Sequence, residues 1–416
     1  MKPNIVATPE RAADGRERID WVRCNMPILR RLEEEFSREQ TFSGVKALVC
    51  VHLEAKTAYL AKVLRAGGAA VAVTGSNPDS TKDEVVAALA EEGMYVYARH
   101  GAKPDEMRTY MGMALDLEPN VVIDDGGDIA ELLHDVRPEL LKGLFGVCEE
   151  TTSGVKRAIA RDAAGRLEFP VMLINEARCK HLFDNVHGTG QSVWDGVIRA
   201  TNLAISGKTV VVVGYGWCGQ GCALRAQGLG AQVIVCEVDP VKAADALMRG
   251  YRVMPLLEAC PQADIVLTVT GVKGTLGYAH FQALKDGALI ANGGHFWDEI
   301  DVESLKEKSV ERKRMRDLVE TFRMPNGGWI QLLGDGNIVN ISCADGHPAE
   351  IMDTSFALQA LCARYLVQQR GELKPKTYRV PQEIDERVAR MKLEAAGVQI
   401  DELSAEQERY LAGWEA

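Results

Sequence analysis

Short apolar runs alternate with amphipathic helical stretches along most of this chain. Residues 46–52 and 70–75 are strand-like, and residues 55–66 between them have helical periodicity. Further strand-like runs lie at residues 94–98, 120–124, 144–149 and 168–174. Strands that alternate with helices form a parallel sheet, because each crossover helix must pass over the sheet before the next strand begins. The pattern predicts an α/β protein with doubly wound parallel sheets.

The sequence also indicates where one helix and one larger block begin and end. Thr81 and Glu84 have the spacing of a capping box, which predicts a helix that begins at Ser80 or Thr81 and ends at Gly93. A second α/β block starts after residue 207 and ends near residues 345–348. The 416 residues are enough for two or three domains, so each block is expected to fold as a unit.

The second block carries a glycine fingerprint. The sequence GYGWCGQG follows the apolar residues 208–213 and places glycines at Gly214, Gly216 and Gly219. A helix-compatible run follows, and the next strand, residues 232–236, ends at Glu237. Such glycines allow a tight turn, a close approach of backbone N–H groups to a pyrophosphate, and close packing of helix on strand. Because Glu237 can accept bonds from ribose hydroxyls and would repel a 2′-phosphate, the motif predicts NAD rather than NADP.

Composition excludes several classes of protein. The net charge is −11 and the pI about 5.4, which disfavours a nucleic-acid partner and leaves small molecules as the expected ones. No apolar run is long enough to cross a membrane, and the N-terminus lacks the apolar core of a signal peptide. The ten cysteines form no CxxC pair. We therefore expect no metal site, no disulfide framework and a cytoplasmic protein.

Polar residues cluster at the ends of the predicted strands, where α/β sheets bind their ligands. These candidates are His52, Asp124, Asp125, Glu149, Glu150, Lys180, Asp184, Asn185, His295 and His347. Each also has a structural alternative: Asp128 and Thr151 are suited to cap helices, and a single histidine is often structural. If both blocks face one cleft, the residues support an NAD-dependent enzyme that uses acid–base chemistry on a polar substrate.

Several longer segments are more specific than any single residue. They are HLEAKTA, SNPDSTKDEVVAAL, VVIDDGGD, EETTSGV, FDNVHGTGQSVWDGVIRAT, GYGWCGQG, NGGHF and GHPAEIMDTSF. With these segments in this order, the chain resembles the S-adenosylhomocysteine hydrolase (adenosylhomocysteinase) family along nearly its whole length. The resemblance implies a place in the methyl cycle of one-carbon metabolism.

The resemblance also implies an unusual reaction. NAD stays bound and is regenerated in each turnover, while the 3′-hydroxyl of the substrate ribose is oxidised to a ketone. The ketone acidifies the C4′–H bond, so a base can remove that proton and homocysteine leaves by elimination. Water then adds and the ketone is reduced, which gives homocysteine and adenosine.

Matching positions imply roles for residues of this chain. The implied catalytic residues are His52, Asp125, Glu150, Lys180, Asp184, Asn185 and His295. Among them Lys180 is the expected base at the 3′-hydroxyl, which requires a setting that lowers its pKa. The implied cofactor residues are Thr151, Thr152, Ser153, Gly214, Gly216, Trp217, Cys218, Gly219, Glu237, Gly293, Gly294, Asn340 and His347. The implied substrate-binding residues are Glu54, Lys56, Thr57, Met352 and Phe356.

Three features depart from the commoner family pattern. Thr189 stands where many members have a cysteine, so a thiol is not needed there. The chain ends at Ala416 without the Lys- and Tyr-containing extension that reaches a neighbouring subunit's NAD site. Lys56 replaces a residue that could accept a bond from the adenine amino group, and a lysine only donates. Hypoxanthine offers an acceptor there, so Lys56 suits S-inosylhomocysteine, whereas Glu54 could still accept from adenine and Lys56 could instead point into solvent.

The predicted organisation follows from the resemblance. We expect a substrate-binding domain of residues 1–188 and 347–378, an NAD-binding Rossmann domain of residues 189–346, and a C-terminal helical segment of residues 379–416. Crossovers near residues 185–190 and 345–348 would act as hinges. A homo-oligomer, arranged as a dimer of dimers, is expected. A non-catalytic NAD-binding regulator and a dehydrogenase that releases NADH remain as alternatives.

Overall fold

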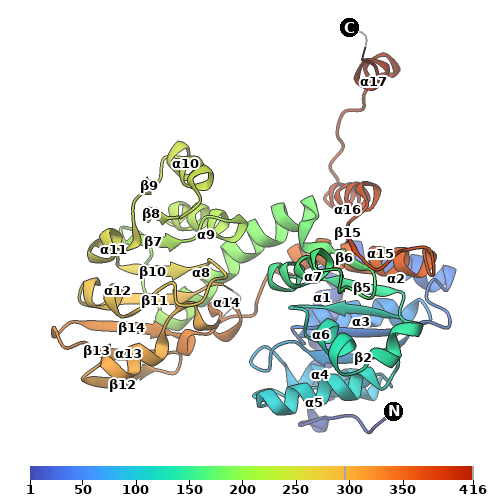
Figure 1. The fold of residues 1–416 in the computed structure, drawn as a ribbon, viewed down its shortest axis with the longest axis horizontal. Coiled ribbons are helices and arrows are strands. Elements are labelled where there is room, and N and C mark those ends of the chain that lie inside the picture. Colours follow the sequence, from blue (N-terminus) through green and yellow to red (C-terminus); the bar gives the residue numbers. More distant parts are fainter. Residues whose placement is uncertain (295–296, 415–416) are drawn as a thin grey trace.

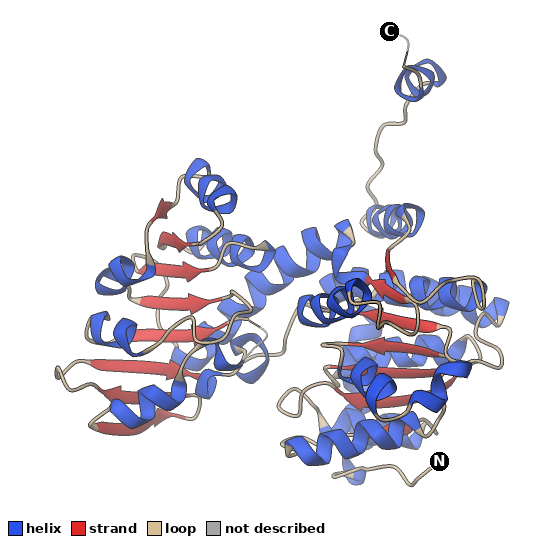
Figure 2. Ribbon diagram, viewed as in Figure 1, coloured by secondary structure: helices blue, strands red, loops and turns tan. Residues whose placement is uncertain are grey.

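The computed structural model describes residues 1–294 and 297–414. It contains two sheets side by side, each with helices on both faces (Figures 1 and 2). The predicted α/β fold with doubly wound sheets is confirmed. Among the described residues no helix combines the length and the apolar character needed to cross a membrane.

The first sheet has seven parallel strands in the order β15-β6-β5-β4-β1-β2-β3. Its strands are β1 (Lys46–Val51), β2 (Ala70–Gly75), β3 (Tyr95–Tyr97), β4 (Val121–Asp124), β5 (Gly146–Glu149), β6 (Val171–Leu173) and β15 (Thr377–Arg379). Side chains alternate between its faces. Along β1, Val49 belongs to the core under one face, and Leu48 belongs to the core under the other.

Helices cover both faces of this sheet. On one face lie α1 (Ala12–Cys24), α2 (Pro27–Glu39), α3 (Ala55–Ala66), α4 (Asp83–Glu91), α15 (Ala349–Gln368) and α16 (Gln382–Ala395). On the other lie α5 (Pro104–Leu115), α6 (Asp128–Asp135) and α7 (Thr152–Ala163). Helix α15 therefore returns to the first sheet after the chain has built the second.

The second sheet has eight strands in the order β12-β13-β14-β11-β10-β7-β8-β9. Its strands are β7 (Thr209–Val213), β8 (Gln232–Cys236), β9 (Arg252–Val253), β10 (Ile265–Thr268), β11 (Ala288–Asn292), β12 (Glu311–Arg316), β13 (Val319–Arg323) and β14 (Trp329–Leu333). Helices on its two faces are α8 (Thr189–Thr201), α9 (Trp217–Gly228), α10 (Pro240–Met248), α11 (Leu256–Ala259), α12 (Tyr278–Ala283), α13 (Val302–Lys308) and α14 (Val339–Ser342).

The structure differs from the sequence prediction at two places in the sheets and helices. Helix α4 begins at Asp83 without the expected capping box, because the Thr81 hydroxyl donates to Asn77 O at 3.1 Å and Glu84 pairs with Arg18 at 3.1 Å. The second sheet is mixed rather than purely parallel, since β12 and β13 form an antiparallel hairpin at its edge. Every residue of β12 is exposed, so burial offers no alternation by which to recognise it.

The C-terminal residues divide into two parts. Strand β15 adds to the edge of the first sheet, and α16 buries Ile384, Val388 and Met391 in the core under that sheet. Beyond α16 an extended segment leads to α17 (Ala405–Ala412), which stands away from the body (Figure 1). Helix α17 contains no buried residue.

Candidate functional site

A cavity of about 760 Å³ lies between the carboxyl ends of the two sheets. The first half contributes residues that directly follow its strands, among them His52 after β1, Asp125 after β4 and Glu150 after β5. The second half contributes Gly216 after β7 and Gly293 after β11. Because parallel strands end at the same edge of a sheet, residues far apart in the sequence meet here. The predicted cleft between the two blocks is present.

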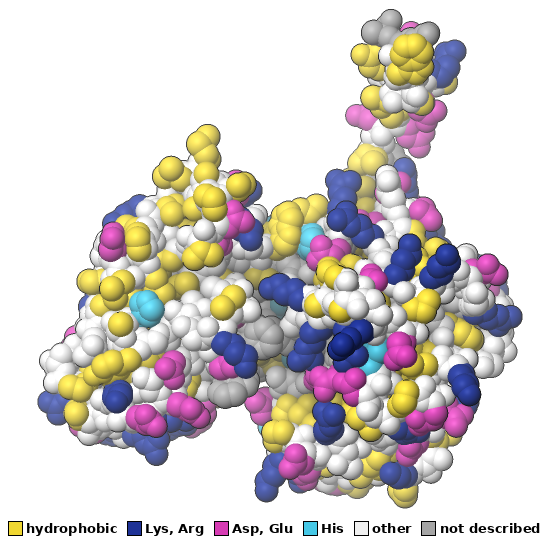
Figure 3. All heavy atoms as spheres, in the orientation of Figure 1, with side chains coloured by type: hydrophobic (Ala, Val, Ile, Leu, Met, Phe, Trp, Pro, Cys, Tyr) yellow, Lys and Arg dark blue, Asp and Glu magenta, His cyan; other side chains and the backbone are white. Residues whose placement is uncertain are grey.

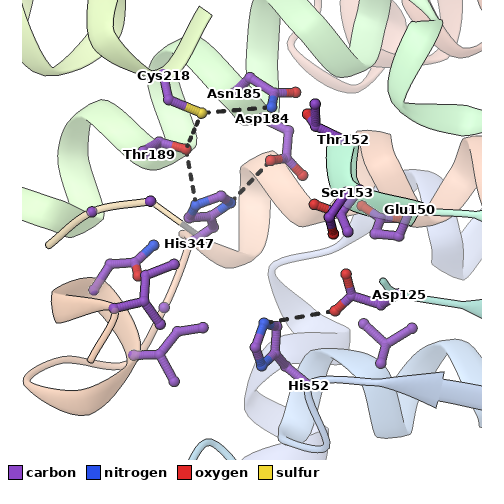
Figure 4. A pocket seen from close by; sticks show the side chains of 18 of the residues that line it. His52, Asp125, Glu150, Thr152, Ser153, Asp184, Asn185, Thr189, Cys218 and His347 are labelled. Carbon is purple, nitrogen blue, oxygen red and sulfur yellow. Dashed lines mark hydrogen bonds and ion pairs between the residues drawn. The ribbon is translucent and has the colours of Figure 1, made fainter. Parts of the chain in front are cut away.

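Lys180 lies at the centre of a buried cluster. It begins a π-helix, Lys180–Gly188, a rare element that is frequent at functional sites. Its Nζ is 2.9 Å from Glu150 Oε1 and 2.8 Å from Asp184 Oδ2. Asp184 Oδ1 in turn lies 3.1 Å from His347 Nδ1 (Figure 4). The structure thus gives one buried lysine two buried carboxylate partners.

The charges of this cluster are set by burial and by pairing. Burial acts to lower the pKa of Lys180, but Asp184 and Glu150 outweigh it, and the pKa is raised above its usual value. The structure thus raises the pKa of Lys180, whereas the sequence analysis expected a setting that lowers it. Burial acts to raise the pKa of Asp184, but Lys180 and His347 hold it below its usual range. Burial raises the pKa of Glu150.

A second group of polar residues faces the cavity opposite this cluster (Figure 4). His52 Nε2 is 3.6 Å from Asp125 Oδ2, and His52 Nδ1 is 2.8 Å from Ser80 Oγ. Ser76 Oγ donates to Asp125 Oδ2 at 3.0 Å. These contacts orient an imidazole and a carboxylate toward the same space, which suits proton transfer on a bound molecule. His295, the other histidine among the implied catalytic residues, lies outside the described residues.

A chain of contacts connects the residues on either side of the two crossovers. Thr189 Oγ1 is 3.3 Å from His347 Nε2 and 3.5 Å from Cys218 Sγ. Asn185 Nδ2 lies 3.7 Å from the same sulfur (Figure 4). Thr189 therefore makes a specific contact at the position where a cysteine is commoner in the family that the sequence resembles.

The glycine fingerprint forms the expected cradle. Gly214 has a φ of +99°, a conformation that favours glycine. A Cβ at Gly219 would lie 2.0 Å from Gly214 O, so helix and strand pack closely only without a side chain. Gly216 lines the cavity, and a Cβ there would meet nothing within 4 Å, which leaves space in front of the N-terminus of α9.

Three unpartnered polar atoms support a ligand in this space. Among the described residues, Ser153 Oγ, Asn185 Oδ1 and Asn340 Oδ1 are buried without a hydrogen-bond partner, and all three residues line the cavity. A buried polar atom without a partner is costly unless a ligand or water satisfies it. Together with the glycine cradle, these atoms fit a dinucleotide with two riboses and a pyrophosphate.

The predicted cofactor residues divide into two groups. Those that line the cavity are Thr151, Thr152, Ser153, Gly216, Trp217, Cys218, Gly293, Gly294, Asn340 and His347. Gly214, Gly219 and Glu237 are not among the described lining residues. Glu237 Oε2 instead accepts from Tyr215 N at 2.6 Å and so ties the end of β8 to the glycine turn.

The five predicted substrate-binding residues, Glu54, Lys56, Thr57, Met352 and Phe356, all line the cavity. The Lys56 side chain is only 9% exposed, so it does not point into solvent. Its Nζ lies 2.8 Å from Glu54 Oε2 and 3.2 Å from Asp345 O. The lysine and the glutamate therefore form one unit at the wall of the cavity, with Glu54 also capping α3.

Sequence reasoning missed two residues that touch the central cluster. Ser355 and Gln359 on α15 hydrogen-bond to Asp184 and Glu150. Both lie on the helix face that also carries Met352 and Phe356, at spacings of three or four residues. Polar residues on an otherwise buried helical face were the signal that could have identified them.

The comparisons with known proteins agree with this geometry. A family model for S-adenosyl-L-homocysteine hydrolase matches residues 4–139, and a second, for the NAD binding domain of the same family, matches residues 185–346. The chain belongs to the S-adenosyl-L-homocysteine hydrolase family. The predicted family and its cofactor, NAD, are confirmed, and the protein is an NAD-dependent hydrolase of this family.

Relatives within the family carry two different names. Adenosylhomocysteinase of Pyrococcus abyssi is 50% identical over 97% of this chain and 96% of its own length. Adenosylhomocysteinase of Thermotoga maritima is 50% identical over 96% of this chain and 99% of its own. S-inosyl-L-homocysteine hydrolase of Methanothermobacter thermautotrophicus is 50% identical over 97% of each. Overall identity therefore does not distinguish the two substrates.

Proposed function

We propose that this protein hydrolyses S-adenosyl-L-homocysteine reversibly to homocysteine and adenosine. The observation that carries the proposal is Lys180, held between Glu150 and Asp184 in a cavity that also contains the dinucleotide cradle. When bound, NAD supplies the oxidant for the ribose C3′ hydroxyl and later the reductant that restores it. The predicted substrate-binding residues Glu54 and Lys56 line the same cavity, so the nucleoside thioether would bind beside that cofactor.

The residues of the chain divide the remaining work. Lys180 accepts the proton of the 3′-hydroxyl, and Asp184 and Glu150 orient its amino group. Binding must weaken the hold of these carboxylates on the ammonium, because a protonated lysine is no base. Asp125 removes the C4′ proton once C3′ is a ketone, and His52 protonates the leaving thiolate and deprotonates the water that replaces it.

S-inosyl-L-homocysteine is the second candidate substrate, and it is supported by Lys56. With Glu54 and Asp345 O as partners, the ammonium retains a third hydrogen for an acceptor such as the hypoxanthine oxygen. Glu54 supports the adenosyl substrate in turn, since its carboxylate can accept from the adenine amino group. The choice between the adenosyl and the inosyl substrate therefore depends on which member of the Lys56–Glu54 pair binds the base.

Homocysteine release from each thioether by the cofactor-loaded protein tests both proposals. In the Lys56→Glu variant we expect kcat/KM for the adenosyl substrate to rise relative to that for the inosyl substrate by about tenfold or more, since one good hydrogen bond is gained and one lost. Lys62→Glu, on the same helix but paired with Glu92, is the matched control. An unchanged ratio would exclude Lys56 as the determinant of the base, and no release from either thioether would exclude the proposed function.

We also propose the quaternary and cellular setting. A homo-oligomer, arranged as a dimer of dimers, is supported by exposed apolar side chains of the C-terminal segment, such as Tyr410, Leu411 and Trp414. A second exposed apolar group lies on α10 and the turn before it (Figure 3): Val238, Val241, Leu247 and Met248. The ten cysteines are all free, which supports a reducing compartment, the cytoplasm.

The division of labour along the chain is likewise a proposal. Residues 1–188 and 347–378 would bind the substrate and residues 189–346 the cofactor, with hinges at residues 185–190 and 345–348. It is supported by the contacts of Thr189 and His347, which lie at the two crossovers and touch each other. Closure about these hinges would exclude water from the keto intermediate.

A further inference from the structure

Side chains of helix α15 hydrogen-bond to Glu150 and Asp184, the two carboxylates that pair with Lys180. Gln359 Nε2 donates to Glu150 Oε2 at 2.5 Å, and Ser355 Oγ donates to Asp184 Oδ2 at 2.7 Å. Both side chains are fully buried. Each carboxylate therefore presents one oxygen to α15, and in Glu150 this leaves the other oxygen, Oε1, for the lysine.

The pKa values of the two carboxyl groups, Glu150 and Asp184, are shifted in opposite directions. The Asp184 carboxylate is in contact with Lys180, His347 and Ser355, and its pKa is lowered. Burial raises the pKa of Glu150, and the Lys180 ammonium and the Gln359 amide act against that effect. Glu150 is therefore the member of the cluster whose charge depends most on a single neutral neighbour.

The groups that act on Lys180 come from four elements. Among the described residues the titratable ones are Glu150 after β5, Asp184 and His181 on the π-helix, His347 at the second crossover, and Cys218 at the start of α9. Helix α15 contributes only the neutral Ser355 and Gln359 to this cluster. A change at Gln359 thus alters the cluster without adding or removing a formal charge.

We propose that Gln359 is a positioning residue: its amide keeps Glu150 ionised and turned toward Lys180, and thereby sets the pH at which Lys180 can accept a proton. The proposal rests on the proposed function, which takes Lys180 as the base. Without the amide donor, the buried carboxyl of Glu150 takes up a proton. The Lys180 ammonium then has one anionic partner in place of two, and it releases its proton at lower pH.

The test compares Gln359→Met with a control on the same helix. Methionine has a similar length and no donor. In the control, Thr354→Val, the lost hydroxyl bonds only to Ile351 O within α15. The first readout is the rate at which acetic anhydride acylates Lys180 in the cofactor-loaded protein without substrate, followed by peptide mass spectrometry against pH. The second is the pH profile of homocysteine release.

For Gln359→Met we expect the midpoint of Lys180 acylation, and the rising limb of the rate profile, to move to lower pH by about one unit. Thr354→Val should leave both where they are in the wild type. An unmoved midpoint, or a shift to higher pH, would overturn the proposal even if turnover falls, because a purely structural role lowers the rate without moving the titration.

Two further arms keep the outcome decisive. If Gln359→Met does not fold, Ser355→Ala makes the same test on Asp184, with a smaller shift expected in the same direction, because Lys180 and His347 remain as partners. Homocysteine release by the wild type is measured alongside. Its absence would overturn the proposed function. An unmoved Lys180 midpoint in Gln359→Met, measured when the wild type releases homocysteine, would overturn the role of Gln359 alone.

Discussion

A single buried carboxyl, that of Asp353 on α15, connects this helix to the N-terminus of α2 on the same face of the first sheet. Its Oδ2 accepts from Ile28 N at 2.9 Å and its Oδ1 from Leu29 N at 2.8 Å. These N–H groups belong to the first turn of α2 and have no partner within that helix. Burial raises the pKa of Asp353 to about 6, although the two bonds act to lower it.

This raised pKa predicts the sign of a pH effect on stability. The folded protein holds the Asp353 proton more tightly than the unfolded chain, in which the pKa of this carboxyl is near 4. The stability that this proton contributes is therefore complete below pH 4 and is lost as the pH rises through 6. Between pH 4 and 7, the unfolding free energy of the wild type should fall by about 1–3 kcal/mol relative to Asp353→Asn, which cannot titrate. Urea unfolding of both proteins across this range measures it. Parallel pH profiles would show that the folded protein and the unfolded chain hold the Asp353 proton equally tightly.

At the residue scale, sequence reasoning placed those residues that belong to specific motifs. His52 and Asp125 each sit in a segment of the family, Lys180 lies just before another that begins at Phe183, and all three line the cavity. It could not foresee that the pKa of Lys180 is raised, because Glu150 approaches from the end of β5 and, together with Asp184 on the same π-helix, outweighs burial. Nor could it identify Gln359, whose proposed role depends on how α15 returns to the first sheet after residues 189–346 have formed another unit.

At the scale of elements, the glycine turn and α9 form the part of the site that the sequence defines best. Gly219 has no room for a side chain, since a Cβ would approach Gly214 O to 2.0 Å. Gly228 at the other end of α9 has nothing within 4 Å of the same position. The two glycines therefore provide a matched pair within one helix.

We expect Gly219→Ala to weaken NAD binding at least a hundredfold, because α9 must move away from the turn and its N-terminus would no longer face the pyrophosphate. Gly228→Ala should bind NAD as the wild type does and should not be destabilised. Calorimetric titration of cofactor-depleted protein with NAD measures both. Equal affinities in the two variants would mean that close packing of α9 on β7 is not what builds the cradle.

Other elements show why local sequence rules fell short. Thr81 and Glu84 have the right spacing for a capping box, but the Thr81 hydroxyl is used by the preceding turn and Glu84 by arginines of the N-terminal region. The β12–β13 hairpin lies at a sheet edge where β12 has no buried face, so its sequence is almost entirely charged. In both cases tertiary contacts decide what the local pattern leaves open.

At the scale of the whole molecule, the two halves meet where the strands of both sheets end, and the chain continues beyond them into a segment without a core of its own. Helix α17 is capped by Ser404, whose hydroxyl accepts from Gln407 N, so the helix has a defined start. Its apolar residues are nevertheless exposed, and Trp414 is 92% exposed. These exposed apolar side chains are a surface that the proposed homo-oligomer would bury.

If this surface forms the proposed homo-oligomer, deleting residues 397–416 should dissociate it while leaving each chain folded, since α16 and the first core keep their contacts. Burial of three large side chains such as Tyr410, Leu411 and Trp414 contributes about 4 kcal/mol or more, which corresponds to roughly a thousandfold in the dissociation constant. Sedimentation equilibrium at micromolar protein measures the mass, and thermal unfolding of the truncated chain checks its fold. The matched variant is the double substitution Tyr410→Ser and Leu411→Ser in the undeleted chain, which keeps the segment and removes apolar surface from it. An unchanged mass in both would place the subunit interface elsewhere on the molecule, with the exposed face of α10 as the next surface to substitute.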